Sequence, residues 1–256
     1  MNPLTVTLIQ TSIEWQQPSA NREKFAQLIE TVADSDLILL PEMFTTGFAQ
    51  ASAQLAEPMD GDTVGWMLAL AKQQNAHIAG SLVVRDHSQV TNRLIWAKPD
   101  GALEYYDKRH LFSFAGEDKV YQAGRQRIVV DCKGWKICPQ ICYDLRFPVW
   151  SRNRNDYDVL VYVANWPKVR VNHWSQLLIA RAIENLSYVV AVNRLGEDGN
   201  GYAHNGQSIA LDPKGKPLVE PGNKSGCFTV SLDYAELIRY REKFRALEDR
   251  DQFEIV

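Results

Sequence analysis

The chain has 256 residues, of which 45% are hydrophobic and 23% charged, and its formal net charge at pH 7 is -3. A chain of this length and composition can bury a large apolar core without disulfides or structural metals. The near balance of charge argues against nucleic acid or a membrane surface as partner. The longest apolar runs, at 37–41 and 159–164, are far shorter than the roughly 20 residues needed to cross a bilayer.

The first ten residues alternate polar and apolar side chains and lack a basic flank, so they predict a strand and not a signal peptide. The four cysteines are too few for a disulfide framework, and Cys132, Cys138 and Cys142 lie in strand-like sequence where reduced thiols are expected. Their spacing fits no usual zinc pattern, and no histidine cluster accompanies them. We therefore expect a soluble, cytoplasmic protein without a metal or another cofactor.

Helical and strand-like segments alternate without a long linker or a repeat, which predicts an α/β fold in one domain over residues 1–256. Two amphipathic helices are predicted in the first third, one that begins at Pro18 and one that Asp62 caps. Their apolar faces follow the i, i+3, i+4, i+7 rule and consist of Phe25, Leu28, Ile29 and Val32 in the first helix and Val64, Met67, Leu68 and Ala71 in the second. Further strands are expected at 37–41, 76–84, 91–98, 102–107, 126–131, 134–141, 157–165, 188–194, 205–211 and 226–231.

A third helix, from about Asn172 to Ser187, has apolar residues on two sides. One side carries Trp174, Leu177 and Leu178, and the other carries Ile179, Ala182, Ile183 and Leu186. A helix of this kind is buried between layers or against a partner subunit. The last stretch, 233–256, predicts a short helix followed by a charged, aromatic tail, with a mobile terminus as the alternative.

Cys142 stands where an apolar, strand-like approach changes to a charged, helix-like segment. This arrangement resembles a nucleophile elbow, which exposes a nucleophile and gives it the backbone amides of a helix N-terminus. Such amides lower the pKa of a thiol. Taken singly, a cysteine in this place is more often a small apolar residue packed at a strand end.

Two other strand-like segments end on ionisable residues, Glu42 after Leu-Leu-Pro and Lys108 after Tyr-Tyr-Asp. Taken singly, Glu42 is typical of a turn or helix-cap carboxylate and Lys108 of a solvated loop charge. Together with Cys142 they stand in the order Glu, Lys, Cys, within the strings Lys-Arg-His-Leu-Phe and Cys-Tyr-Asp-Leu-Arg-Phe-Pro. This pattern resembles the nitrilase superfamily of carbon-nitrogen hydrolases, and the resemblance covers nearly the whole chain.

The resemblance implies a four-layer α-β-β-α sandwich of the nitrilase type and a homodimer, with the two-sided helix at the interface and residues 233–256 reaching the other subunit. It also implies an enzyme that cleaves amide C–N bonds through a cysteine thioester. In that reaction Glu42 is the general base, Cys142 is the nucleophile, and Lys108 stabilises the oxyanion together with the backbone N–H of Tyr143.

The resemblance further implies a second carboxylate at Glu117, which orients Lys108 or positions substrate and water. The adjacent Asp118 is the other register, and a solvated loop carboxylate is the structural alternative. A cysteine with a histidine base is the rival mechanism, for which His110 and His173 are the candidates.

Arg146 follows the cysteine by four residues, so its guanidinium is predicted to reach the same cleft and hold a substrate carboxylate, with a structural ion pair as the alternative. Phe44, Phe112, Tyr143 and Trp166 stand at strand ends. We predict that they wall a small, partly apolar pocket for the substrate.

Within the superfamily, these strings together with Leu-Pro-Glu-Met-Phe and Ala-Asn-Trp-Pro are most similar to the bacterial omega-amidase branch. Its members hydrolyse the terminal amide of 2-oxo acids such as 2-oxoglutaramate and 2-oxosuccinamate. Sibling branches with the same triad act on deaminated glutathione, N-carbamoyl compounds or nitriles, so the triad predicts the reaction class better than the substrate. The expected ligand is a small amide that carries a carboxylate. An inactive interaction module is the non-enzymatic alternative.

Overall fold

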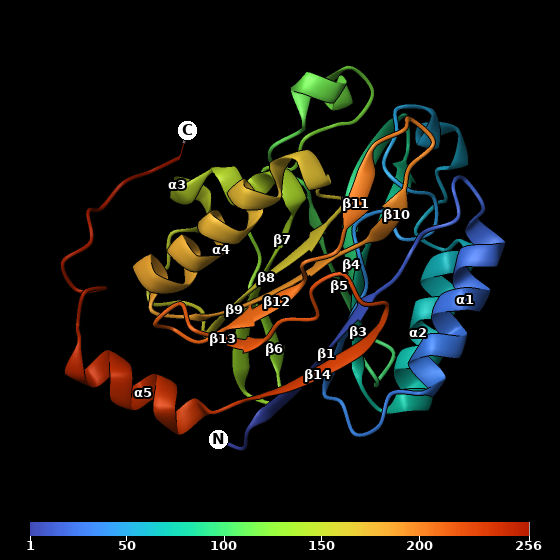
Figure 1. Cartoon of the computed structure of the whole chain (residues 1–256). Helices are drawn as coiled ribbons and strands as arrows, with labels where there is room; N and C mark the ends of the chain where they lie inside the picture. Colours follow the sequence, from blue (N-terminus) through green and yellow to red (C-terminus); the bar gives the residue numbers. More distant parts are fainter. Residues whose placement is uncertain (256) are drawn as a thin grey trace.

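The computed structural model describes residues 1–255, in which two six-stranded β-sheets lie face to face with helices on both outer surfaces (Figure 1). The predicted four-layer α-β-β-α arrangement is thereby confirmed. Val256, the last residue of the predicted tail, lies outside the described residues.

The strands are β1 (Leu4–Gln10), β2 (Leu37–Leu39), β3 (His77–Asp86), β4 (Gln89–Ala97), β5 (Leu103–Asp107), β6 (Val130–Cys132), β7 (Trp135–Ile141), β8 (Val159–Ala164), β9 (Tyr188–Asn193), β10 (Leu195–Glu197), β11 (Ala203–Asn205), β12 (Ile209–Leu211), β13 (Pro217–Val219) and β14 (Gly226–Leu232). The α-helices are α1 (Pro18–Glu30), α2 (Asp62–Gln74), α3 (Pro148–Ser151), α4 (Val171–Asn185) and α5 (Tyr234–Lys243). The 3-10 helices are η1 (Ala51–Leu55), η2 (Ser113–Ala115), η3 (Glu117–Lys119), η4 (Cys142–Arg146) and η5 (Lys168–Arg170).

The strand order brings the carboxyl ends of several strands to one edge of the sandwich. The first sheet has the order β14-β1-β2-β3-β4-β5, with β1, β2 and β3 parallel. The second has the order β13-β12-β9-β8-β7-β6, with β7, β8 and β9 parallel. Helices α1 and α2 cover the first sheet, and α3 and α4 cover the second (Figure 1). Sites in α/β proteins form outside the carboxyl ends of parallel strands, so functional side chains are expected at this edge.

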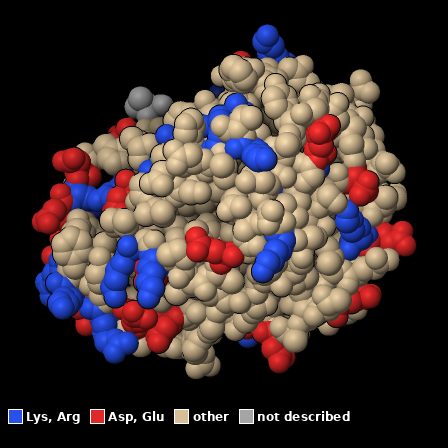
Figure 2. All heavy atoms as spheres, viewed as in Figure 1, with Lys and Arg blue, Asp and Glu red and all other residues tan. Residues whose placement is uncertain are grey.

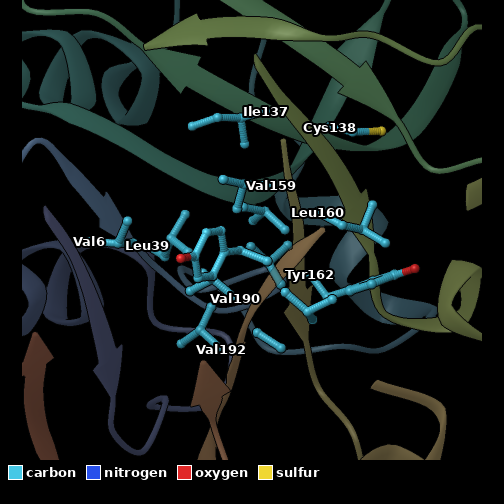
Figure 3. Packing of buried hydrophobic residues seen from close by; sticks show 14 of the residues in the cluster. Val6, Leu39, Ile137, Cys138, Val159, Leu160, Tyr162, Val190 and Val192 are labelled. Atoms are coloured by element: carbon cyan, nitrogen blue, oxygen red, sulfur yellow. The ribbon is translucent and has the colours of Figure 1, made fainter. Parts of the chain in front are cut away.

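The central strands β2, β8 and β9 are buried on both faces, which explains why they are continuous apolar runs. Along β1, Val6 and Leu8 pack between the sheets, whereas the neighbouring Ile9 packs in the cluster that includes α1 and α2. Figure 3 shows Val6 and Leu39 of the first sheet in the same cluster as Val190 of the second. Because successive side chains of a strand alternate between faces, one apolar strand contributes to two core layers.

The second helix starts differently from the prediction. Asp62 is the first residue of α2, and the N-cap position belongs to Gly61, which has no side chain to cap with. Glu57 serves instead, because its carboxylate accepts the backbone N–H of Thr63 at 2.8 Å and the Thr63 hydroxyl at 2.5 Å. The carboxylate that holds this helix end therefore comes from the loop before it.

The strand predicted over 126–131 is shorter than expected, because β6 begins only at Val130. Val130 pairs with Ile137 in an antiparallel register, which would place the next bonded pair at Pro139. Proline has no N–H to donate, so the ladder ends there.

The strand predicted over 205–211 is divided into β11 and β12. Gly206 and Gln207 lie between them with left-handed φ angles of +70° and +60°. An extended strand cannot continue through this region of backbone conformation, so the prediction of one strand is wrong.

Helix α4 is only partly covered by the described residues. Trp174 and Leu178 on one apolar side and Ala182 on the other are completely buried, whereas Ile179 is half-buried and Ile183 is 47% exposed. Packing of the exposed part of α4 against a partner stays a prediction.

The surface carries charges of both signs. On the face shown in Figure 2 these side chains are intermixed, and they are densest around α5, at the left of the view. After α5 the chain continues to residue 255 as turns and irregular structure. Among residues 1–255, no helix combines the length and the apolar character needed to span a membrane.

Candidate active site

Ionisable side chains from distant parts of the sequence meet at the carboxyl edge of the sheets. Glu42 follows β2, Lys108 follows β5 and Cys142 follows β7. Lys108 Nζ donates to Glu42 Oε1 at 2.8 Å and to the two oxygens of Glu117 at 3.1 and 2.9 Å. Glu42, Lys108 and Glu117 are at most 1% exposed, and Cys142 is 9% exposed. The structure thus brings together all members of the predicted triad.

The position of Glu117 resolves the choice between the two adjacent acidic residues. Glu117 is buried against Lys108 and also accepts the backbone N–H of Phe112 at 2.5 Å. Asp118 is exposed. The second carboxylate of the cluster is therefore Glu117, and it is not a solvated loop residue.

Cys142 lies on a sharp turn between β7 and the following segment. Its φ of +44° is in the left-handed region, which non-glycine residues rarely adopt and which is often found at functional sites. The helix-like segment predicted after Cys142 is the 3-10 helix η4, which ends at Arg146. Pro148 explains this end, because a proline keeps the preceding residue, Phe147 with φ of -116° and ψ of 88°, out of the helical region.

Asp144 secures this turn, a role that we did not predict. Its carboxylate is fully buried and accepts the backbone N–H of Ile141 at 3.1 Å and the hydroxyl of Tyr106 at 2.7 Å. It also accepts the backbone N–H of His110 at 2.9 Å. Asp144 therefore ties the turn to the end of β5, which carries Lys108. Its only signal in the sequence is its place in the Cys-Tyr-Asp string.

Two buried asparagines orient the Glu42 carboxylate, and neither was predicted. Asn92 Nδ2 donates to Glu42 Oε1 at 2.9 Å and to Glu117 Oε1 at 3.3 Å. The backbone N–H of Asn165 donates to Glu42 Oε2 at 2.8 Å. Asn165 lies in the Ala-Asn-Trp-Pro string, whereas Asn92 is in the middle of β4 and has no local signal.

Burial and charge together set the ionisation of the cluster. Burial by itself lowers the pKa of Lys108, but the charges of Glu117 and Glu42 outweigh it and raise that pKa, so the amine stays protonated. Burial raises the pKa of Cys142, and the charge of Glu42 raises it further against the opposing effect of Lys108. The expected lowering of the thiol pKa by a helix N-terminus is therefore wrong, because η4 is only one short 3-10 helix. The raised pKa favours the thiol form of Cys142 over the thiolate.

Neither histidine of the rival mechanism lies at the thiol. His110 Nδ1 is 2.8 Å from Asp144 Oδ1, and His173 Nδ1 is 3.1 Å from Arg146 Nη2. Within the described residues, neither histidine is part of the lining of the pocket that contains Cys142. The ionisable group that can accept a proton beside the thiol is the Glu42 carboxylate.

A pocket of about 720 Å³, its opening to solvent included, leads to the cluster. Its aromatic lining consists of Phe48, Phe112, Phe114, Tyr143, Trp166 and Tyr202. Three of the predicted wall residues, Phe112, Tyr143 and Trp166, are among them. Over the part of the chain that the structure describes, no group of three or more side chains suited to hold a metal ion lies together.

Phe44 is not in this wall, and its prediction is corrected. It is fully buried and packs on Phe25 and Trp66, with ring centroids 5.3 and 5.7 Å apart. The left-handed turn at Met43, with φ of +42°, precedes it, and the side chain points to the layer of α1 and α2. Phe48 lines the pocket in its place.

Two guanidinium groups line the pocket, one from Arg146, as predicted, and one from Arg170, which was not predicted. Arg146 Cζ lies 4.8 Å from the centroid of the Trp166 ring, and Arg170 Cζ lies 5.3 Å from that of Phe112. Neither group has a carboxylate within salt-bridge distance in residues 1–255. The alternative of a structural ion pair for Arg146 is therefore wrong, and both charges are available to an anion.

Comparison with known proteins adds an independent line of evidence. The family model described as carbon-nitrogen hydrolase matches residues 5–242. The chain is 46% identical to the omega-amidase YafV of Escherichia coli over the full length of both proteins. It is 36% identical to a 2-oxoglutaramate amidase of Bacillus subtilis over 96% of each.

Solved structures agree with this result. A CN-hydrolase superfamily protein of Xanthomonas campestris, crystallised with an arsenic adduct in its active site, has a TM-score of 0.99 and 46% identity, with 100% of both chains covered. A member of the nitrilase superfamily from Saccharomyces cerevisiae has a TM-score of 0.85 and 26% identity, with 95% of this chain and 94% of that one covered.

Proposed function

The chain belongs to the carbon-nitrogen hydrolase family and is an amidohydrolase, and we propose that it is an omega-amidase. In this proposal it hydrolyses the terminal amide of 2-oxo acids, such as 2-oxoglutaramate and 2-oxosuccinamate, to the 2-oxo acid and ammonia. The observation that carries the proposal is the buried cluster of Glu42, Lys108 and Cys142 beside a pocket whose guanidinium groups have no carboxylate partner in residues 1–255. Full-length similarity to proteins named omega-amidase and 2-oxoglutaramate amidase supports the same substrate class.

The first step needs a base, because the raised pKa of Cys142 keeps the thiol protonated. Glu42 takes that proton, while Asn92 and the backbone of Asn165 hold its carboxylate in place. The sulfur then forms a bond to the amide carbon, and the electrons of the C=O bond move to the oxygen. The product of this step is a tetrahedral intermediate with an oxyanion.

The Lys108 ammonium and the backbone N–H of Tyr143 stabilise the oxyanion. Glu117 keeps Lys108 charged and fixed through its two hydrogen bonds. Glu42 passes its proton to the amide nitrogen, and the C–N bond breaks to release ammonia and leave a thioester. Water then gives a proton to Glu42 and attacks the thioester carbon. The C–S bond breaks, and the proton returns to Cys142 as the acid leaves.

Substrate binding is assigned to the other residues that line the pocket. Arg146 holds the substrate carboxylate in a bidentate pair, since a guanidinium without a carboxylate partner gains most from an anionic ligand. Phe112 and Trp166 enclose the short apolar chain between carboxylate and amide. A substrate with an anionic end and an amide end satisfies both halves of the pocket.

We also propose that the protein is a cytoplasmic homodimer, with one domain per chain over 1–256. Ile183 on the half-covered side of α4 supports such an interface, and 233–256 is proposed to reach the partner. Neither nucleic acid nor a membrane has a place in the proposal, in keeping with the mixed charges in Figure 2. Light scattering of the wild type should give twice the mass of one chain and that of Ile183→Lys a lower mass, and a monomeric wild type would contradict the dimer.

Ammonia release by the wild type and by Cys142→Ala tests the proposed activity. The panel contains 2-oxoglutaramate, 2-oxosuccinamate, glutamine, deaminated glutathione and an N-carbamoyl amino acid. We expect strong turnover of the two short oxo acid amides and none in the variant. Preference for deaminated glutathione or for the carbamoyl compound would move the chain to another branch. Inactivity on the whole panel would favour an interaction module.

A further inference from the structure

The pocket contains a second guanidinium group, that of Arg170, which has no role in the proposed reaction steps. Arg170 ends η5, and its backbone is anchored because its carbonyl oxygen accepts the indole N–H of Trp166 at 2.8 Å. Its guanidinium carbon lies 5.3 Å from the ring centroid of Phe112 and 5.9 Å from that of Phe114. The side chain therefore lies along the aromatic wall of the pocket, and the substitution of its charged end leaves the backbone anchor intact.

Arg170 is close enough to Arg146 for the two positive charges to repel each other. Burial lowers the pKa of Arg146, and the charge of Arg170 lowers it further. Besides Glu42, the pocket lining contains one carboxylate, Asp198. Asp198 accepts the backbone N–H groups of Asn200 and Tyr202 at 2.9 and 3.0 Å, so it is engaged within its own turn. Two like charges thus face the pocket without a carboxylate partner in residues 1–255.

We infer that Arg170 is a specificity-determining residue which, together with Arg146, admits amides of 2-oxo acids and excludes amides of 2-amino acids. The inference rests on the proposed function and concerns the same pocket. A 2-oxo acid offers a carboxylate and a carbonyl oxygen at adjacent carbons, and both accept hydrogen bonds from guanidinium groups. A 2-amino acid carries an ammonium on the same carbon. That cation would enter a field of two positive charges with no free carboxylate to receive it.

Steady-state kinetics of Arg170→Gln test this inference. The substrates are 2-oxoglutaramate, glutamine, 4-carbamoylbutanoate, which has the same chain without a group at carbon 2, and the neutral pentanamide. The matched control is Lys168→Gln, because Lys168 is an exposed cation of the same 3-10 helix that does not line the pocket.

We expect Arg170→Gln to lower kcat/KM for the two anionic amides by on the order of 10–100-fold, mainly through KM, because it removes charge-assisted hydrogen bonds. The value for glutamine should stay or rise, so the preference for 2-oxoglutaramate over glutamine falls by at least about 10-fold. Turnover of pentanamide, which has no charged end, should fall less than that of the two anionic amides, so a loss confined to the anionic amides reports lost charge recognition. Arg170→Lys should keep most of the preference, since it keeps the charge.

Three results decide the matter. An unchanged preference in Arg170→Gln overturns the inference, and so does an equal fall in Lys168→Gln, because that fall would reflect general surface charge. A wild type without activity on 2-oxoglutaramate overturns the proposed function instead. In that event the ratio between 4-carbamoylbutanoate and glutamine decides the inference, because those two substrates differ in the ammonium group alone.

Discussion

Replacing Lys108 with methionine tests whether charge holds the buried cluster together. Methionine keeps much of the volume of lysine but leaves Glu42 and Glu117 without the cation that now lies 2.8 and 2.9 Å from them. Breaking a buried ion pair costs about 3–5 kcal/mol. For a chain of this size, about 2–4 °C of unfolding temperature corresponds to each kcal/mol, so the midpoint should fall by roughly 6–20 °C.

The loss of stability should also depend on pH. Without the cation, burial and mutual repulsion raise the pKa of the remaining carboxylates above their values in the unfolded chain. A group whose pKa is raised by folding contributes stability that is present below its unfolded pKa and is lost as pH rises through the folded pKa. In wild type, burial already raises the pKa of Glu117, against the opposing charge of Lys108. The deficit of Lys108→Met relative to wild type should therefore be larger near pH 8 than near pH 5.

Differential scanning calorimetry at both pH values measures this effect. In the double variant Lys108→Met/Glu117→Gln the repulsion is removed, so part of the stability should return while the amidase activity stays lower by on the order of 10²–10³. The control is Lys24→Met, which removes an exposed pair with Glu14 at 3.1 Å and should cost less than about 1 kcal/mol. If Lys108→Met unfolded at the wild-type temperature at both pH values, the account of the cluster would be refuted.

Three further predictions follow from individual side chains. Phe44→Ala should destabilise the protein by about 3–5 kcal/mol with little change in KM, because Phe44 is a core residue. Phe48→Ala should instead raise KM with a smaller loss of stability, because Phe48 lines the pocket. Urea unfolding and steady-state kinetics distinguish the two variants, and a reversed pattern would restore Phe44 to the pocket. Asp144→Asn should lower kcat by at least about 10-fold and stability by about 1–3 kcal/mol, because the asparagine amide accepts hydrogen bonds through one oxygen only. A variant with the kcat of the wild type would argue against the role of Asp144 in the turn. Alkylation of Cys142 by iodoacetamide, followed by mass spectrometry, should accelerate steadily from about pH 7 to about pH 9.5, because burial and Glu42 raise the thiol pKa. An alkylation rate independent of pH over this range would contradict a raised thiol pKa.

Much of the fold and the reactive centre was predictable from local sequence. Apolar runs such as 159–164 predict strands buried on both faces, and the structure has β8 there. The strings around Glu42, Lys108 and Cys142 identified three strand ends in a characteristic order. The resemblance of these strings to the nitrilase superfamily predicted amide hydrolysis, and a nucleophile, a base and a cation are what that reaction requires.

Other parts of the site depend on contacts that no local pattern encodes. Asn92 and Asp144 hold the cluster through hydrogen bonds between residues that are distant in the chain. Phe44 and Phe48 are both phenylalanines after the same strand, and only the turn between sheet and helices decides which one faces the pocket.

The sequence by itself determined the strand pattern, because this follows from residue type and short-range order, and its motif strings determined the class of reaction through their resemblance to a known family. The tertiary structure decided the direction of the thiol pKa, the identity of Glu117 as second carboxylate and the presence of Arg170 in the pocket. The physical reason is that burial and charge at a site are sums over neighbours. Here those neighbours come from two sheets, and only their packing brings them together.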